Sequence, residues 1–165
     1  MKLYRLKAKQ YLPIGPEEAW AFLSDPRNLQ KITPDHMKFE ILSGADRPMY
    51  AGQIIQYTVV PLKGFRTRWV SEITHYKQGH YFVDEQRFGP YSLWHHKHFI
   101  HEEENGVLME DIVDYKLPLG PLGRMAQALF VKRQLTQVFR YRVQALEKAF
   151  GTLPGRTSEL TINAI

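Results

Sequence analysis

Residues 93–123 read LWHHKHFIHEEENGVLMEDIVDYKLPLGPLG, and two runs within this stretch alternate apolar and polar residues on either side of the turn sequence EENG. This pattern predicts an antiparallel β-hairpin. Because successive strand residues point to opposite faces, the first run should place four side chains together: Trp94, His96, His98 and Ile100. His95 and His101 have the opposite parity, and we expect them to face solvent.

The second run of the hairpin carries one charged residue on a face that is otherwise apolar. That face consists of Val107, Met109, Asp111, Val113 and Tyr115. A carboxylate directed at an apolar layer is costly unless it is paired. His96 and His98 on the first run are the nearest source of a partner, so we expect Asp111 to pair with the histidine strand.

The composition is that of one ordinary globular domain without thiol chemistry. The chain has 165 residues, of which 44% are hydrophobic and 13% aromatic, and it has no cysteine. This length can bury a substantial core, and the aromatic residues suit either that core or a cavity lined by rings. Since disulfides are excluded and the first residues lack the long apolar segment of a signal peptide or membrane span, we expect a cytoplasmic protein with no membrane span.

The formal net charge of +5 raises the question of a nucleic-acid partner. The basic residues are mixed with acidic ones along the whole chain, and their densest set falls on the expected outer side of the last helix. This set is Arg124, Lys132, Arg133, Arg140, Arg142 and Lys148. A solvated helix face explains it, because no nucleic-acid-binding motif accompanies it. We expect no nucleic-acid partner, and a protein-interaction role for this basic face remains an alternative.

The rest of the chain predicts one strand, two short helices, six more strands and one long helix. Residues 3–12 alternate as a strand, and the two short helices begin at Pro16 and Pro26. Turn signals separate the six further strands, at 38–42, 53–60, 65–76, 80–87, 91–102 and 107–117. Apolar residues at helical spacing predict a helix over residues 121–150. The polar residues 151–165 read as a loosely held tail.

This order predicts an α+β helix-grip fold, in which a curved antiparallel sheet of about seven strands surrounds the long C-terminal helix. Short connections make neighbouring strands antiparallel, and a sheet of this width should curl. A bent sheet cannot contact a straight helix along its full width. The space left between them suits a small hydrophobic ligand.

Residues 1–150 resemble the START/Bet v 1-like (SRPBCC) superfamily, in particular its bacterial ligand-binding and polyketide cyclase/dehydrase-like members. Locally, GPYSLWHHKHFI at 89–100 and YKLPLGPLG at 115–123 are similar to a bacterial subgroup with a W-x-H-x-H strand and a P-x-G-P-x-G segment before the last helix. The resemblance implies a ligand-binding domain over 1–150 followed by a flexible tail over 151–165. Such relatives bind lipids, sterols, polyketides or plant hormones in the hollow, and some catalyse cyclisation or dehydration there.

The two histidines of the predicted hairpin support more than one kind of chemistry. An imidazole titrates near neutrality, so His96 and His98 can act as general acid and base, with Asp111 orienting one ring. They can equally be hydrogen-bonded groups of a pocket wall. Histidines at this spacing can also be two metal ligands, with Asp111 or another carboxylate as a third. The sequence places no third ligand, and we expect no metal and no cofactor.

The ligand contacts expected from the sequence are mostly aromatic. Trp69 should face inward, and a tyrosine at 57 or 115 can orient a ligand through its hydroxyl or simply fill the core. The resemblance favours an inward position for Phe82, Asp84 and Gln86. The complete expected set is Tyr57, Trp69, Phe82, Asp84, Gln86, Trp94, His96, His98, Asp111, Tyr115 and Leu135.

The function expected from these observations is binding of a small hydrophobic or aromatic molecule between the sheet and the C-terminal helix. The first alternative is an enzyme of the cyclase or dehydratase type that uses His96, His98 and Asp111. The second is the protein-interaction module described above. The sequence also leaves open a homodimer.

Overall fold

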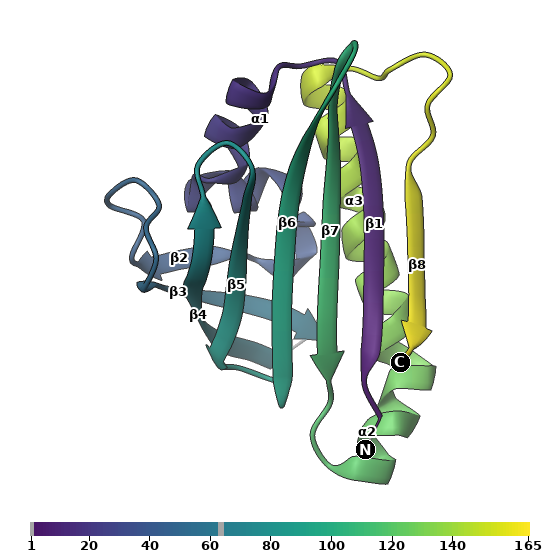
Figure 1. Cartoon of the computed structure of the whole chain (residues 1–165). Helices are drawn as coiled ribbons and strands as arrows, with labels where there is room; N and C mark the ends of the chain where they lie inside the picture. The colour runs from purple at the N-terminus through teal and green to yellow at the C-terminus, as the bar shows by residue number, and fades with distance from the viewer. Residues whose placement is uncertain (1, 63–64) are drawn as a thin grey trace.

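The computed structural model describes residues 2–62 and 65–165, so the turn predicted at Lys63 and Gly64 lies outside the described residues. These residues form one antiparallel sheet of eight strands. The strands are β1 (Tyr4–Leu12), β2 (Glu40–Ser43), β3 (Gln53–Leu62), β4 (Phe65–Lys77), β5 (Tyr81–Phe88), β6 (Leu93–Glu103), β7 (Gly106–Lys116) and β8 (Glu159–Ala164). The α+β helix-grip prediction is confirmed (Figure 1).

The helical segments follow the first strand and the last hairpin. They are α1 (Pro16–Leu23), the 3-10 helices η1 (Pro26–Ile32) and η2 (Asp35–Met37), α2 (Gly120–Ala126), the π-helical turn η3 (Gln127–Val131) and α3 (Lys132–Phe150). Proline occupies the first turn of α1 and of η1, where its missing N–H costs nothing. The Asp25 side chain accepts a hydrogen bond from the Arg27 backbone N–H and so caps η1.

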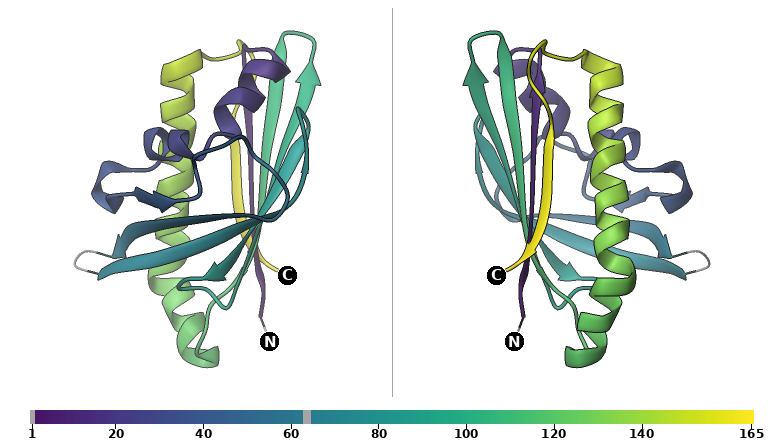
Figure 2. Two further views of the ribbon diagram at one scale, coloured as in Figure 1. Left: turned by 90° about the vertical axis from the view of Figure 1, so that its left-hand side faces the viewer. Right: turned by 90° about the vertical axis from the view of Figure 1, so that its right-hand side faces the viewer.

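The sheet is strongly bent around α3. Its strand order is β2-β3-β4-β5-β6-β7-β1-β8, so six consecutive strands form a meander and β1 joins at the end of it. The register between β4 and β5 shifts twice, between Val70 and Ser71 and between Ile73 and His75, and such irregularities bend a sheet. Strands β3 and β4 therefore swing across toward α3, whereas β6, β7, β1 and β8 stand on one side of it (Figure 2).

The conformation of the segment between β7 and the long helix requires a glycine at position 123. A Cβ atom at Gly123 would lie 2.1 Å from the backbone oxygen of Pro118, a separation that no side chain tolerates. The chain turns sharply there, with Leu119 in the left-handed region at a φ of 64°. This tight turn brings α2, η3 and α3 back over the concave face of the sheet.

The prediction of a loose tail over 151–165 is wrong for its last residues. Strand β8 pairs antiparallel with β1, so the sheet has one strand more than expected. Ile162 is buried in the same hydrophobic cluster as Leu6, Val113 and Leu135. The short run ELTINA has the β-branched residues and alternation of a strand, but it needs the free edge of β1 as a partner, and that edge is distant in sequence.

Residues of both hydrophobic clusters contribute to a shared cavity. The first cluster joins α1 and η1 to β4 and to the β6–β7 hairpin, through residues such as Leu23, Ile73 and Ile100. The second joins β1, β7 and α3.

Among the described residues, no helix is long and apolar enough to cross a membrane.

Candidate functional site

A cavity of about 310 Å³ lies between the bent sheet and α3. Its wall is mostly apolar and aromatic, with contributions from β3, β4, β5, β6, η1 and α3. Five of the expected apolar or aromatic contacts line it: Tyr57, Trp69, Phe82, Trp94 and Leu135. The Trp69 Nε1–H is buried without a hydrogen-bond partner in the described part of the chain, so it is a donor that a bound molecule can use.

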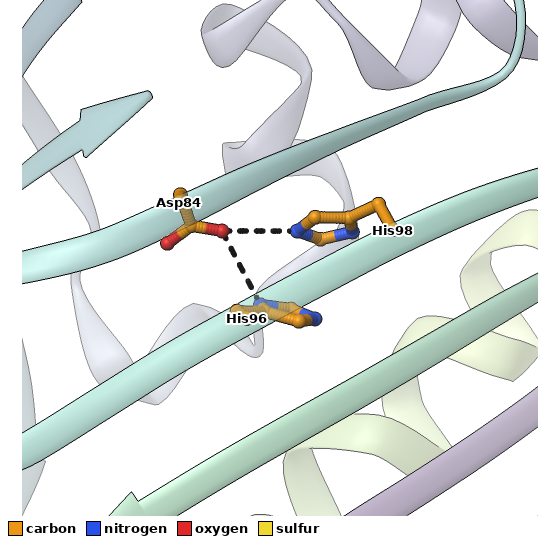
Figure 3. A group of neighbouring side chains, drawn as sticks. All are labelled: Asp84, His96 and His98. Atoms are coloured by element: carbon orange, nitrogen blue, oxygen red, sulfur yellow. Dashed lines mark hydrogen bonds and ion pairs between the residues drawn. The ribbon is translucent and has the colours of Figure 1, made fainter. Parts of the chain in front are cut away.

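One part of the cavity wall is polar and chemically distinct. Asp84, His96 and His98 all line the cavity, and they come from the adjacent strands β5 and β6, which pair in register at Asp84 and His96. His98 Nε2 lies 3.0 Å from Asp84 Oδ2 in a hydrogen bond. His96 Nδ1 lies 3.5 Å from the same oxygen. Figure 3 shows both rings directed at this carboxylate.

Asp111 contacts the other nitrogen of each ring. His96 Nε2 is hydrogen-bonded to Asp111 Oδ1 at 3.2 Å, and His98 Nδ1 lies 2.7 Å from the same oxygen. The expected pairing of Asp111 with the histidine strand is therefore confirmed. Asp111 is not among the cavity-lining residues. It supports the histidines from behind, whereas Asp84 meets them on the cavity side.

Arg142 completes this cluster and corrects the sequence analysis, which placed it on the outer face of the last helix. Its side chain is about 10% exposed, and its Nη2 lies 3.4 Å from Asp111 Oδ1. Helical spacing in the sequence indicates this buried position. Leu135, Phe139 and Leu146 are buried on α3. Arg142 follows the first two by seven and three residues and precedes the last by four, so it lies on the same helix face. A cation on the buried face of an amphipathic helix needs an anion opposite.

Electrostatics shift the pKa values of the two histidines in opposite directions. Burial lowers the pKa of His96, and the neighbouring charge of His98 lowers it further. Burial also opposes ionisation of His98, but the charges of Asp111 and Asp84 and the hydrogen bonds to them outweigh it and raise the pKa of His98. Burial likewise opposes the ionised carboxylate of Asp111, yet Arg142 and His98 hold its pKa well below the usual range.

Asp84 follows the same pattern as Asp111. Burial works against its ionised form, but its hydrogen bond to His98 and the charges of both histidines keep its pKa below the ordinary value. Two carboxylates thus face two imidazoles and one guanidinium. Groups of opposite charge lie within reach of one another, which buried charges need in order to be tolerated.

Besides Asp111, two further expected contacts lie outside the cavity wall. Gln86 is bonded to the backbone of Tyr91 through both ends of its amide, at 2.6 Å and 3.2 Å, so it holds the β5–β6 connection. Tyr115 is fully buried in the second hydrophobic cluster, where its hydroxyl accepts a 2.6 Å hydrogen bond from Gln127. Burial raises its pKa to about 12. Both were expected as ligand contacts, and the structure gives them structural roles.

Asp84, His96 and His98 could also hold a metal ion. Each offers one ligand atom, and the three atoms lie within 4.8 Å of one another. Sequence reasoning lacked this third ligand because Asp84 reaches the histidines only through the pairing of β5 with β6.

Comparison with solved structures identifies the fold. A protein from Thermus thermophilus superposes with a TM-score of 0.69 at 17% identity, covering 87% of this chain and 94% of its own. Ginseng major latex-like protein 151 from Panax ginseng gives 0.66 at 10% identity, covering 90% and 97%. Norcoclaurine synthase from Thalictrum flavum, in complex with a transition-state analogue, gives 0.62 at 10% identity, covering 90% and 98%.

The chain has the START/Bet v 1-like fold. No protein-family model matches the sequence, and no curated protein does. Identities of this size establish the architecture alone, so the Bet v 1-like resemblance is confirmed at the level of the fold. The subgroup with a W-x-H-x-H strand stays a prediction. What the cavity of this Bet v 1-like chain binds has to be argued from its own residues.

Proposed function

We propose that the protein binds a small, mostly apolar molecule with one polar end in the cavity between the sheet and α3. The observation that carries this proposal is the uneven chemistry of the wall. Aromatic and aliphatic side chains form most of it, and the polar groups of Asp84, His96 and His98 converge at one place. Binding pockets for small molecules combine these features, with apolar area for affinity and a few polar groups for orientation.

The cavity volume also limits the ligand. About 310 Å³ is at the lower end of the range of roughly 300–1,000 Å³ seen for small-molecule pockets. This favours a compact ring-containing molecule. The rings of Tyr57, Trp69 and Trp94 stand close together, with centroids 5.9 Å and 5.3 Å from that of Trp69, and they offer stacking surface to such a ligand.

The proposal is tested by filling the cavity. Val138 lines it, whereas the adjacent Gln137 is exposed on the same helix. We expect Val138→Trp to abolish binding of the apolar fluorescent probe 1-anilinonaphthalene-8-sulfonate, and the matched control Gln137→Trp to bind it like wild type. Thermal unfolding of both variants checks that they are folded. Equal probe binding by both would place the probe outside the cavity and reject the proposal.

Both imidazoles line the cavity and their pKa values are shifted in opposite directions, which favours a second candidate function, acid–base catalysis on the bound molecule. The lowered pKa of His96 suits a proton acceptor, and the raised pKa of His98 suits a proton donor. An enzyme of the cyclase or dehydratase type predicts that His98→Gln abolishes turnover of the bound molecule while its affinity stays within a few-fold. A binding protein without chemistry predicts that the affinity itself falls.

A further inference from the structure

We propose that Asp84, His96 and His98 bind one divalent transition-metal ion of the Zn²⁺ class at the wall of the cavity. The inference goes beyond the proposed function, because it concerns this side-chain cluster and does not require an apolar ligand in the cavity.

The spacing of the three ligand atoms fits such an ion. Ligands at about 2.1 Å from a tetrahedral ion lie about 3.4 Å from one another. Here Asp84 Oδ2 lies 3.0 Å from His98 Nε2 and 3.5 Å from His96 Nδ1, and no pair exceeds 4.8 Å. Two imidazoles and one carboxylate are a ligand set for Zn²⁺ and for Fe²⁺. Small side-chain movements would admit the ion.

The surroundings of the histidines match those of metal ligands. A histidine bound to a metal usually gives its other ring nitrogen to a carboxylate, which fixes the tautomer and the ring orientation. Asp111 Oδ1 stands 3.2 Å from His96 Nε2 and 2.7 Å from His98 Nδ1. It leaves the Nδ1 of His96 and the Nε2 of His98 on the side of Asp84. Arg142 in turn holds Asp111 from the helix side.

The position of the cluster leaves room for a further ligand. Asp84, His96 and His98 line the cavity, whereas Asp111 lies behind them, so the open coordination position of the ion would face the space that holds the bound molecule. Histidines bound to a metal are neutral. The charges of the divalent ion, the Arg142 guanidinium and the two carboxylates then sum to one positive charge. That charge suits an anionic oxygen as the remaining ligand, from hydroxide or from the bound molecule.

The test uses the metal alone. The purified chain is stripped with EDTA, dialysed and titrated with Co²⁺, whose visible absorption reports nitrogen and oxygen ligation, and Zn²⁺ is then added to displace it. We expect one ion per chain, Zn²⁺ displacing Co²⁺, and affinity at least tenfold weaker in Asp84→Asn and in His96→Gln. We expect Asp111→Asn to weaken binding about 10- to 100-fold through its effect on the rings.

The matched controls are His95→Ala and His101→Ala, on the same strand but on its other face. They should bind the ion like wild type. Circular dichroism and probe binding in EDTA check that Asp84→Asn and His96→Gln remain folded with an intact cavity. The inference is overturned if wild type binds neither ion at micromolar concentration, or if binding survives Asp84→Asn and His96→Gln. Probe binding in EDTA tests the proposed function separately, so the two can fail independently.

Discussion

At the scale of single residues, Asp111 and Arg142 decide whether the polar cluster can exist inside the protein. Asp111 contacts both histidines and lies 3.4 Å from Arg142 Nη2. Each charge is tolerated because an opposite charge is within reach. The cluster is therefore a unit, and removal of one member should be costly.

Replacing Arg142 tests this interdependence. Arg142→Met keeps most of the side-chain volume but leaves Asp111 without its guanidinium. We expect the free energy of unfolding to fall by about 3 kcal/mol, the cost of breaking a buried ion pair from one side. Denaturant unfolding at pH 7 measures it. The exposed neighbour Arg140→Met is the control, with an expected change within about 0.5 kcal/mol. Equal stability of the two variants would contradict the role given to Arg142.

Strand parity made part of this cluster predictable. Alternation in residues 94–100 and 107–115 was enough to place His96, His98 and Asp111 together, because the side-chain period of a strand is fixed. Arg142 was missed because basic residues on a helix were taken as one solvated face. Its position relative to Leu135 and Leu146 would have shown that it lies on the buried side.

At the scale of elements, the outer face of the hairpin is held by ion pairs that join three strands. Asp114 on β7 accepts hydrogen bonds from Arg5 on β1, at 2.6 Å and 2.9 Å, and from Lys97 on β6 at 2.8 Å. Burial works against the ionised carboxylate, but these bonds hold the pKa of Asp114 below its ordinary value.

This depressed pKa fixes the sign of a pH dependence. The stabilisation by Asp114 is fully present above the pKa of about 4 that the carboxyl has when unfolded, and it is lost as the pH falls through the lower folded value. Asp114→Asn should cost about 1 kcal/mol of unfolding free energy at pH 7, and the difference from wild type should shrink below about pH 4. Urea unfolding from pH 3 to pH 7 measures it. Asp46→Asn, on an exposed loop, should show no such trend, and a pH-independent difference for Asp114→Asn would refute the explanation.

The last strand is a second feature at this scale. Ile162 is 7% exposed and packs in the cluster shared by β1, β7 and α3. We expect Ile162→Ala to lower the unfolding free energy by about 2–3 kcal/mol. Asn163→Ala, at an exposed position of the same strand, should change it by less than about 0.5 kcal/mol. If both substitutions are neutral, β8 contributes nothing to the folded domain.

The elements differ in how well the sequence predicts them. Strands β3 to β7 were predictable because each is joined to its neighbour by a short turn, so local patterns contain both partners. Strand β8 was not, because it pairs with β1 across almost the whole length of the chain. Its residues have only a weak strand pattern. That pattern indicates a strand clearly only when the free edge of β1 is known to lie beside it.

At the scale of the whole molecule, the cavity is a consequence of sheet curvature. The sequence predicted that a bent sheet and a straight helix would leave a hollow, because the order of elements implies it. The volume and the exact lining depend on register shifts and on the crossing of α3 (Figure 2). These are tertiary features that periodicity cannot supply. The same holds for Asp84, which joins the histidines only through the pairing of β5 with β6.

The most direct test of the proposed binding function is native mass spectrometry of the purified protein before and after denaturation, with wild type, Gln137→Trp and Val138→Trp compared. We expect one compact, mostly apolar molecule on wild type and on Gln137→Trp, either carried through purification or taken up from a mixture of aromatic and polycyclic compounds. Val138→Trp should carry none. A wild-type protein that takes up no member of the mixture, or a Val138→Trp protein that retains the same molecule, would contradict the account.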